Sequence, residues 1–213
     1  MSAPNHQPPR DCSLCPRLYE FRQQNRRAFP DFHNAPVPSF GSIDAALLIV
    51  GLAPGLKGAN RTGRPFTGDY AGELLYGSLK RHGMVRGDYR ARPDDGFELL
   101  GVRITNAVRC VPPENKPQPI EINTCRQFLI PEIAAMTNLR AILALGQIAH
   151  QSVITMLKLK KKDHAFGHGA RAEYEGLTIL GSYHCSRYNT NTGVLTETMF
   201  DTVMGAAKKA AGL

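Results

Sequence analysis

The segment from Ala46 to Asp69, ALLIVGLAPGLKGANRTGRPFTGD, constrains the fold more than any other part of the chain. It begins with a continuous apolar run over residues 46–50, which is typical of a parallel strand buried on both faces. The loop that follows combines glycines, which permit close backbone approach, with Pro54 and Pro65, which stiffen the path between them. Open α/β sheets bind ligands at the carboxyl ends of such strands, so this loop is a candidate active site.

Strand and helix patterns alternate along the rest of the chain, as expected for a parallel sheet with helices on both faces. Further strands are predicted over residues 101–106, 141–145 and 177–183. Helices are predicted over residues 16–28, 71–84, 120–138, 147–159 and 196–211, and a polar loop over residues 184–193. We therefore predict one α/β domain over residues 11–213, preceded by a disordered tail at residues 1–10.

Composition adds a bias toward polyanionic partners. The 213 residues carry a formal net charge of +8, which attracts nucleic acid, although a solvated basic surface would give the same count. No apolar run is long enough to cross a bilayer, and the polar, proline-rich start does not resemble a secretory signal. We therefore expect a cytoplasmic protein that does not bind membranes.

Four of the five cysteines have a spacing that suits metal binding. Cys12 and Cys15 are two residues apart, so both thiolates can converge on one centre, and Cys110 and Cys125 could complete a set of four. Such a set can hold zinc or an iron–sulfur cluster, and the spacing does not choose between them. The alternatives are a core role for Cys125 and a redox role for Cys12 and Cys15, although a redox pair would normally adjoin a strand of a thioredoxin-like unit.

The glycine-rich loop matches neither a phosphate loop nor a dinucleotide-binding fingerprint, because the required Lys-Ser/Thr end and glycine spacing are missing. The loop does contain Phe66, which could stack on a base, and the carboxylate of Asp69. Asn106 and His184 follow two other predicted strands, and the Asn106 amide could pair with a base edge. Each residue also has an ordinary structural explanation in a core, turn or helix cap, but parallel strands bring their carboxyl ends to one edge.

Four motifs resemble those of the uracil-DNA glycosylase superfamily, and are most similar to its family 5, or type b, branch of bacterial and archaeal enzymes. The similarity extends from Cys12 to about Gly193. The motifs are Gly51-Leu-Ala-Pro-Gly55, Asn60-Arg-Thr-Gly-Arg-Pro-Phe-Thr-Gly-Asp69, Ile104-Thr-Asn-Ala-Val-Arg-Cys110, and His184-Cys-Ser186 with Asn191-Thr-Gly193.

This resemblance implies a three-layer α/β/α sandwich with a central four-stranded parallel sheet. It also implies a structural [4Fe–4S] cluster, because Cys12, Cys15, Cys110 and Cys125 resemble the cluster ligands of families 4 and 5. The implied reaction is hydrolysis of the N-glycosidic bond of uracil, and of other deaminated or damaged bases, flipped out of DNA. We expect a monomeric enzyme of the cytoplasm and nucleoid that acts in base excision repair.

Carried onto this chain, the family's site residues divide into three groups. Asp69, Asn106 and His184 would be catalytic: Asp69 would orient water or stabilise the sugar cation, and His184 would stabilise the leaving base. Base binding would involve Asn106, His184, a stacking Phe66 and the first-motif residues Leu52, Ala53 and Gly55. The DNA-contacting loop would supply Ser186, Arg187, Tyr188, Asn189 and Asn191.

Two features of the motifs bear on this assignment. The last motif reads His-Cys-Ser where family 5 enzymes usually read His-Pro-Ser, and we interpret Cys185 as a small packing residue. The first motif is apolar at Leu52, as in family 5, which suggests a roomier pocket that accepts bases besides uracil. The alternative is a non-catalytic iron–sulfur protein that binds nucleic acid on the same scaffold.

Overall fold

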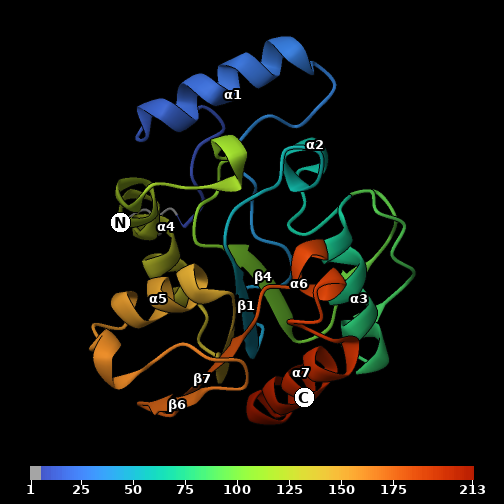
Figure 1. Ribbon diagram of the computed structural model, residues 1–213, viewed down its shortest axis with the longest axis vertical. Helices are drawn as coiled ribbons and strands as arrows, with labels where there is room; N and C mark the ends of the chain where they lie inside the picture. Colours follow the sequence, from blue (N-terminus) through green and yellow to red (C-terminus); the bar gives the residue numbers. More distant parts are fainter. Residues whose placement is uncertain (1–5) are drawn as a thin grey trace.

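A five-stranded sheet forms the centre of the computed structural model, which describes residues 6–213 (Figure 1). Four strands run parallel and the fifth pairs antiparallel at one edge. In order across the sheet they are β4 (Val102–Asn106), β1 (Leu47–Gly51), β5 (Ala141–Leu145), β7 (Leu177–Ser182) and β6 (Arg171–Tyr174).

The position of strand β1 in the sheet explains why its residues are apolar at consecutive positions. It lies between β4 and β5, and every residue in it is buried. Leu47 and Ile49 belong to the hydrophobic core on one face of the sheet, whereas Leu48 and Val50 belong to the core on the other face. A strand covered on both faces has no reason to alternate apolar and polar residues.

Helices cover both faces of this sheet, which confirms the predicted α/β class (Figure 1). Helices α3 (Tyr70–Arg81) and α7 (Glu197–Ala211) pack on one face, and α4 (Pro119–Ala135) and α5 (Gln147–Met156) pack on the other. Helix α1 (Pro16–Ala28) lies at the top of Figure 1, beyond the carboxyl end of β1, next to the short helix α2 (Ala59–Thr62).

The sheet differs from the expected four strands by the addition of β6. This strand forms a hairpin with β7 through Glu175 and Gly176, both of which have positive φ angles. Its residues are exposed or half-buried in alternation, so no apolar run marked it in the sequence. A second small hairpin pairs β2 (Val85–Arg86) with β3 (Glu98–Leu99), in a region where only turns were evident.

The predicted helices are all present, with shifted ends. The helices predicted over residues 120–138 and 147–159 end earlier, at Ala135 and Met156. The segment 184–193, predicted to be a loop, contains the one-turn helix α6 (Arg187–Asn191), because the Ser186 side chain accepts a hydrogen bond from the Asn189 N–H and caps it. Two short 3-10 turns, η1 (Pro113–Asn115) and η2 (Lys161–Asp163), complete the elements.

Part of the predicted N-terminal tail contacts the rest of the protein. Residues 1–5 lie outside the described residues, but residues 6–10 are described. The carbonyl oxygen of Pro9 accepts a hydrogen bond from the Cys12 N–H, and Pro8 lines a pocket with the cysteines. The ordered domain therefore begins before residue 11.

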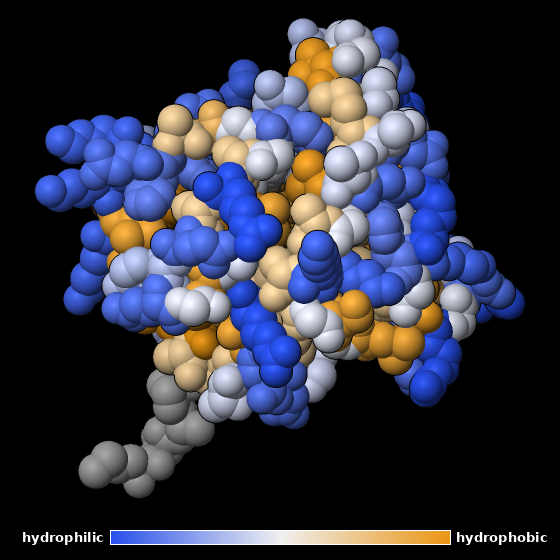
Figure 2. Space-filling view, turned by 90° about the horizontal axis from the view of Figure 1, so that it is seen from below, coloured by the Kyte–Doolittle hydropathy of each residue, from blue (hydrophilic) through white to orange (hydrophobic). Residues whose placement is uncertain are grey.

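Within residues 6–213, no helix is both long and apolar enough to cross a membrane. Figure 2 shows one face of the molecule, on which hydrophilic residues predominate and hydrophobic residues form small separate groups.

Candidate active site

The side chains singled out at the ends of three parallel strands line one recess. Phe66 and Asp69 belong to the loop after β1, Asn106 ends β4, and His184 follows β7. The remaining lining residues are small: Ala53, Gly55, Ala59 and Ala71. The recess encloses about 270 Å³ of space, including its open mouth.

Asn106 presents an unused hydrogen-bonding atom to this recess. Its side chain is buried, and its Oδ1 has no hydrogen-bond partner among residues 6–213. Gly51 lies beside it in the sheet, and a Cβ atom there would come within 2.4 Å of Asn106 Oδ1 and 2.5 Å of the Phe66 ring. The absent side chain therefore keeps the recess open, and a bound donor would satisfy the buried oxygen.

Asp69 has two roles that use different oxygens. Its Oδ1 accepts a hydrogen bond of 3.2 Å from the Gly72 N–H and so caps helix α3, which is the ordinary explanation for an aspartate at this place. Its Oδ2 lies over Gly58, where a Cβ would be only 2.2 Å away, and faces Gly55. Burial raises the pKa of this carboxyl group. The cap through Oδ1 therefore leaves Oδ2 directed at the glycines beside the recess.

His184 supplies a neutral imidazole to the same recess. Burial lowers the pKa of its side chain, so the ring is uncharged at neutral pH. Its ring lies 6.2 Å from the Phe66 ring, centroid to centroid, with 29° between the planes. The Asn189 amide donates a 2.8 Å hydrogen bond to the His184 carbonyl oxygen, which ties α6 to this position.

The loop that carries Phe66 is held in a strained conformation. Phe66 has a backbone φ angle of +53°, which residues other than glycine rarely adopt. The Tyr76 hydroxyl donates to the Pro65 carbonyl oxygen at 2.5 Å, and the Tyr89 hydroxyl donates to the Phe66 carbonyl oxygen at 3.4 Å. These contacts fix the backbone on either side of the Phe66 ring.

Beneath this loop lies a buried ion pair that the sequence analysis did not identify. Arg64 binds Asp95 through two hydrogen bonds of 2.7 and 2.8 Å, and the guanidinium group holds the pKa of that carboxyl well below its usual range. The guanidinium also lies over the rings of Phe40, Tyr76, Tyr89 and Phe97. Arg64 was visible only as one letter of a motif, and 31 residues separate it from its partner.

The residues predicted to contact DNA lie on and around α6. Ser186 and Asn189 serve the segment's own structure, as the cap and as the donor to His184. Arg187, Tyr188 and Asn191 are exposed; Tyr188 is 74% exposed, and the Arg187 guanidinium lies over the Tyr70 ring. Cys185 is fully buried in the main core, as expected of a packing residue.

The three first-motif residues predicted to bind the base differ in their placement. Ala53 and Gly55 line the recess, whereas Leu52 is not among its lining residues. The Leu52 carbonyl oxygen accepts a hydrogen bond from the Val108 N–H, which fastens the segment after β1 to the segment after β4.

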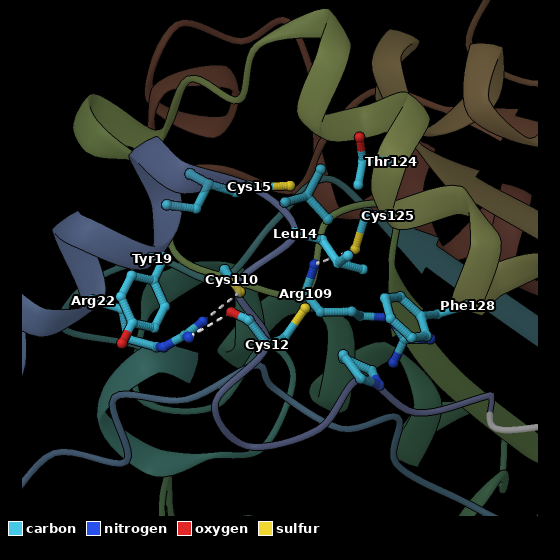
Figure 3. Close-up of a pocket in the computed structure, with 13 residues that line it drawn as sticks. Cys12, Leu14, Cys15, Tyr19, Arg22, Arg109, Cys110, Thr124, Cys125 and Phe128 are labelled. Atoms are coloured by element: carbon cyan, nitrogen blue, oxygen red, sulfur yellow. Dashed lines mark hydrogen bonds between the residues drawn. The ribbon is translucent and has the colours of Figure 1, made fainter.

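A second pocket brings the four predicted metal-ligating cysteines together (Figure 3). Cys12 and Cys15 precede α1, Cys110 follows β4, and Cys125 lies on α4. All four are free thiols in a mostly hydrophobic surrounding that includes Phe128. Three parts of the chain thus supply sulfur atoms to one enclosed space.

Four cysteines can hold either a single zinc ion or an iron–sulfur cluster, and the two differ in how far apart the sulfur atoms lie. Within residues 6–213, no three His, Cys, Asp or Glu side chains converge as ligands of a single metal ion. Zinc would require its four thiolates about 2.3 Å from one atom, whereas an iron–sulfur cluster is larger and spaces its ligands farther apart. Four cysteines around a common pocket are the donor set that an iron–sulfur cluster uses, and these four are the residues that could hold one.

Burial also affects the protonation of these thiols. It raises the pKa of Cys15 to about 11 and that of Cys110 to about 12. The Arg109 N–H donates a hydrogen bond of 3.3 Å to Cys125 Sγ, and the Arg22 guanidinium opposes the rise at Cys110. Cys15 and Cys110 are therefore protonated at neutral pH, so metal binding by these two thiols would release protons.

Comparisons with known proteins agree with the motifs. Residues 38–208 match the family described as "Uracil DNA glycosylase superfamily". A "Type-5 uracil-DNA glycosylase" of Thermus thermophilus is 44% identical over 95% of this chain and 94% of its own length. The protein of that name from Pyrobaculum aerophilum is 38% identical over 95% of this chain and 91% of its own length. A "Type-4 uracil-DNA glycosylase" of the same organism is 35% identical over 71% of this chain and 64% of its own length.

The Arg64–Asp95 pair yields a prediction about the loop it supports. Replacing Arg64 with methionine leaves the Asp95 carboxylate without its counter-ion, with only the Arg90 and Phe97 N–H groups still donating to it, so the free energy of unfolding should fall by about 3 kcal/mol in urea titrations. Amide exchange should accelerate most at residues 64–69. The control is Arg61→Met, an exposed arginine of the same segment, which should change stability by less than about 0.5 kcal/mol. Equal effects of the two substitutions would contradict the assigned role.

Proposed function

Because this chain belongs to the uracil DNA glycosylase superfamily, and within it to the type-5 branch, we propose that it hydrolyses the N-glycosidic bond between uracil and deoxyribose in DNA. The products would be free uracil and an abasic site. The observation that carries this proposal is the recess in which Phe66, Asp69, Asn106 and His184 meet. Its few polar groups differ in chemistry, as the steps of such a reaction require.

The recess would receive a base that has left the duplex. Extruding a nucleotide costs on the order of a few kcal/mol, and least for a mismatched base such as uracil opposite guanine. Phe66 would stack on the flipped base. The unpaired Oδ1 of Asn106 would accept the imide N–H of uracil, which cytosine lacks at that position. Recognition would therefore depend on a buried oxygen of the recess that has no partner among residues 6–213.

The leaving base departs with negative charge, and the recess offers neutral donors to it. His184 would donate from an imidazole that burial keeps uncharged, together with backbone N–H groups of residues 52–55. Donors fixed in place before the reaction stabilise developing charge without reorganisation. Because the His184 imidazole is neutral, it would not form an ion pair with the Asp69 carboxylate, which could then act on the sugar.

Asp69 would act on the sugar side of the bond. As the bond breaks, the sugar becomes cationic, and an ionised carboxylate can stabilise it or orient the attacking water. The Oδ1 hydrogen bond to the Gly72 N–H fixes the side chain, while Oδ2 faces the recess across Gly55 and Gly58. Among the residues that line the recess, Asp69 is the only carboxylate.

DNA would bind over the α6 segment next to the mouth of the recess. Arg187, Tyr188 and Asn191 are exposed there, and an exposed tyrosine could fill the space that the flipped base leaves. The net charge of +8 favours association with phosphates. Asn189 connects this surface to the chemistry, because its amide holds the backbone of His184.

The cofactor would be a [4Fe–4S] cluster held by Cys12, Cys15, Cys110 and Cys125. Its contribution would be structural, joining the segment before α1 to α4 and to the segment after β4. Cys110 lies four residues beyond Asn106 on the same segment, so the cluster would also steady one wall of the recess.

The decisive experiment is a cleavage assay with oligonucleotides that each contain one altered base. Uracil should be released and leave a strand that breaks in alkali. We also expect release of hypoxanthine or another damaged base, because the wall after β1 is apolar. Cleavage of uracil alone would refute the broader range, and binding without cleavage of any substrate would favour the non-catalytic alternative.

Asp69 should determine the acidic limb of the pH–rate profile. Its carboxylate must be ionised to act, and its pKa is raised, so activity should fall at a higher pH than for an ordinary aspartate. Asp69→Asn keeps a cap for α3 but should lower single-turnover rates about 100-fold or more and abolish that limb. Asp94→Asn, at an exposed carboxylate, is the control. An unchanged limb in Asp69→Asn would exclude Asp69 as the group that titrates.

Gly51→Ala tests whether the recess receives the base. The new Cβ would meet Asn106 Oδ1 and the Phe66 ring, so we expect a loss of turnover of about 100-fold or more in the cleavage assay. Gly77→Ala on α3 is the control, because its nearest contact is the flexible end of Arg81 at 3.4 Å. If Gly51→Ala were as active as Gly77→Ala, the base must bind elsewhere.

A further inference from the structure

One arginine at the cysteine pocket is buried without a carboxylate partner. Arg22, on α1, is 1% exposed and lines the pocket with the four cysteines (Figure 3). Its Nη1 donates a hydrogen bond of 3.2 Å to Cys110 Sγ, and its Nη2 donates one of 2.6 Å to the Cys12 carbonyl oxygen. Its Nε atom is buried and has no partner among residues 6–213.

Arg109, which also lines the pocket, and two arginines of α1 are each paired with a carboxylate. Arg17 binds Glu121, Arg26 binds Asp11, and Arg109 binds Glu132. Within the described residues, no carboxylate lies within salt-bridge distance of Arg22. A further interaction, of the guanidinium over the Tyr19 ring at 5.2 Å, is attractive but carries no full negative charge.

A buried and unpaired guanidinium is costly, because it has lost its hydration without gaining a counter-ion. Proteins retain such a charge where an anion compensates it. Asp11 is near enough to interact with Arg22 electrostatically, but its carboxylate is paired with Arg26. Among the residues that line the pocket, the groups that become anionic on metal binding are the thiols, and Arg22 donates to one of them, Cys110. Four thiolates carry more negative charge than an iron–sulfur core neutralises, so the complete centre would be an anion.

We propose that Arg22 is the counter-ion of the metal–thiolate centre, and that it holds the centre in place and sets its reduction potential. This inference rests on the cluster included in the proposed function. Hydrogen bonds to ligand sulfurs and local charge are the means by which proteins tune such centres. Because Arg22 also donates to the Cys12 backbone, one side chain would fix two ligand segments, those before α1 and after β4.

The experiment compares the holoprotein with Arg22→Met, which removes the charge, and Arg22→Lys, which keeps it without the planar fork. Arg27→Met, at an exposed position on the same helix, is the control. Iron and sulfide content, the visible absorbance, the rate of iron loss to a chelator and the reduction potential would be measured for each. None of these readouts depends on the glycosylase reaction.

Arg22→Met should lose iron roughly 10- to 100-fold faster than the wild type. Its reduction potential should be more negative, because the added electron is no longer stabilised by a nearby cation. Arg22→Lys should fall between the two, and Arg27→Met should match the wild type. If Arg22→Met does not fold, Arg22→Gln, which also removes the charge, carries the test, and a potential and iron-loss rate equal to those of the wild type would overturn the proposal.

The outcomes separate this inference from the function it rests on. A wild-type protein purified without oxygen that holds no iron and sulfide would refute the cluster and the role of Arg22 together. A wild-type cluster that behaves identically in Arg22→Met would refute only the role of Arg22. In both cases the cleavage assay reports independently on glycosylase activity.

Discussion

The parallel pairing of β4, β1, β5 and β7 is the constraint on which the rest of the structure depends. Strands that run the same way end at one edge, so the chain leaves the sheet repeatedly at the same place. Asn106, His184 and the loop with Phe66 and Asp69 reach one recess for this reason. Burial of β1 on both faces makes this edge rigid, because a register shift would disrupt two cores at once.

Rigidity at this edge is reinforced by buried charges whose partners come from distant segments. Arg64 and Asp95 support the strained loop from below. Glu132 on α4, which is fully buried, binds both Arg103 on β4 and Arg109 just after it. Breaking such contacts would leave a buried charge unpaired, which costs more than an exposed ion pair contributes. Each segment at the active edge therefore has little freedom to move away.

The recess and the cysteine pocket lie next to each other and share parts of their walls. Ala53 lines the recess and also packs against the cluster of side chains that includes Cys110 and Cys125. The segment after β4 passes from Asn106 to Cys110 and so serves both sites. A structural centre in the pocket would thus stabilise the wall of the recess in which, under the proposed function, a base would bind.

Local periodicity in the sequence was enough to predict the α/β class, the four parallel strands and the helices between them. The residues of the recess could be predicted as a group because parallel strands end at the same edge of a sheet. Periodicity missed β6, whose alternating exposed residues give no apolar signal, and the one-turn α6, which depends on the Ser186 cap. Only the tertiary structure paired Arg64 with Asp95, left Asn106 Oδ1 unpaired and turned Arg22 toward Cys110. Such contacts join residues far apart in the chain, and their energies depend on burial, which local patterns do not encode.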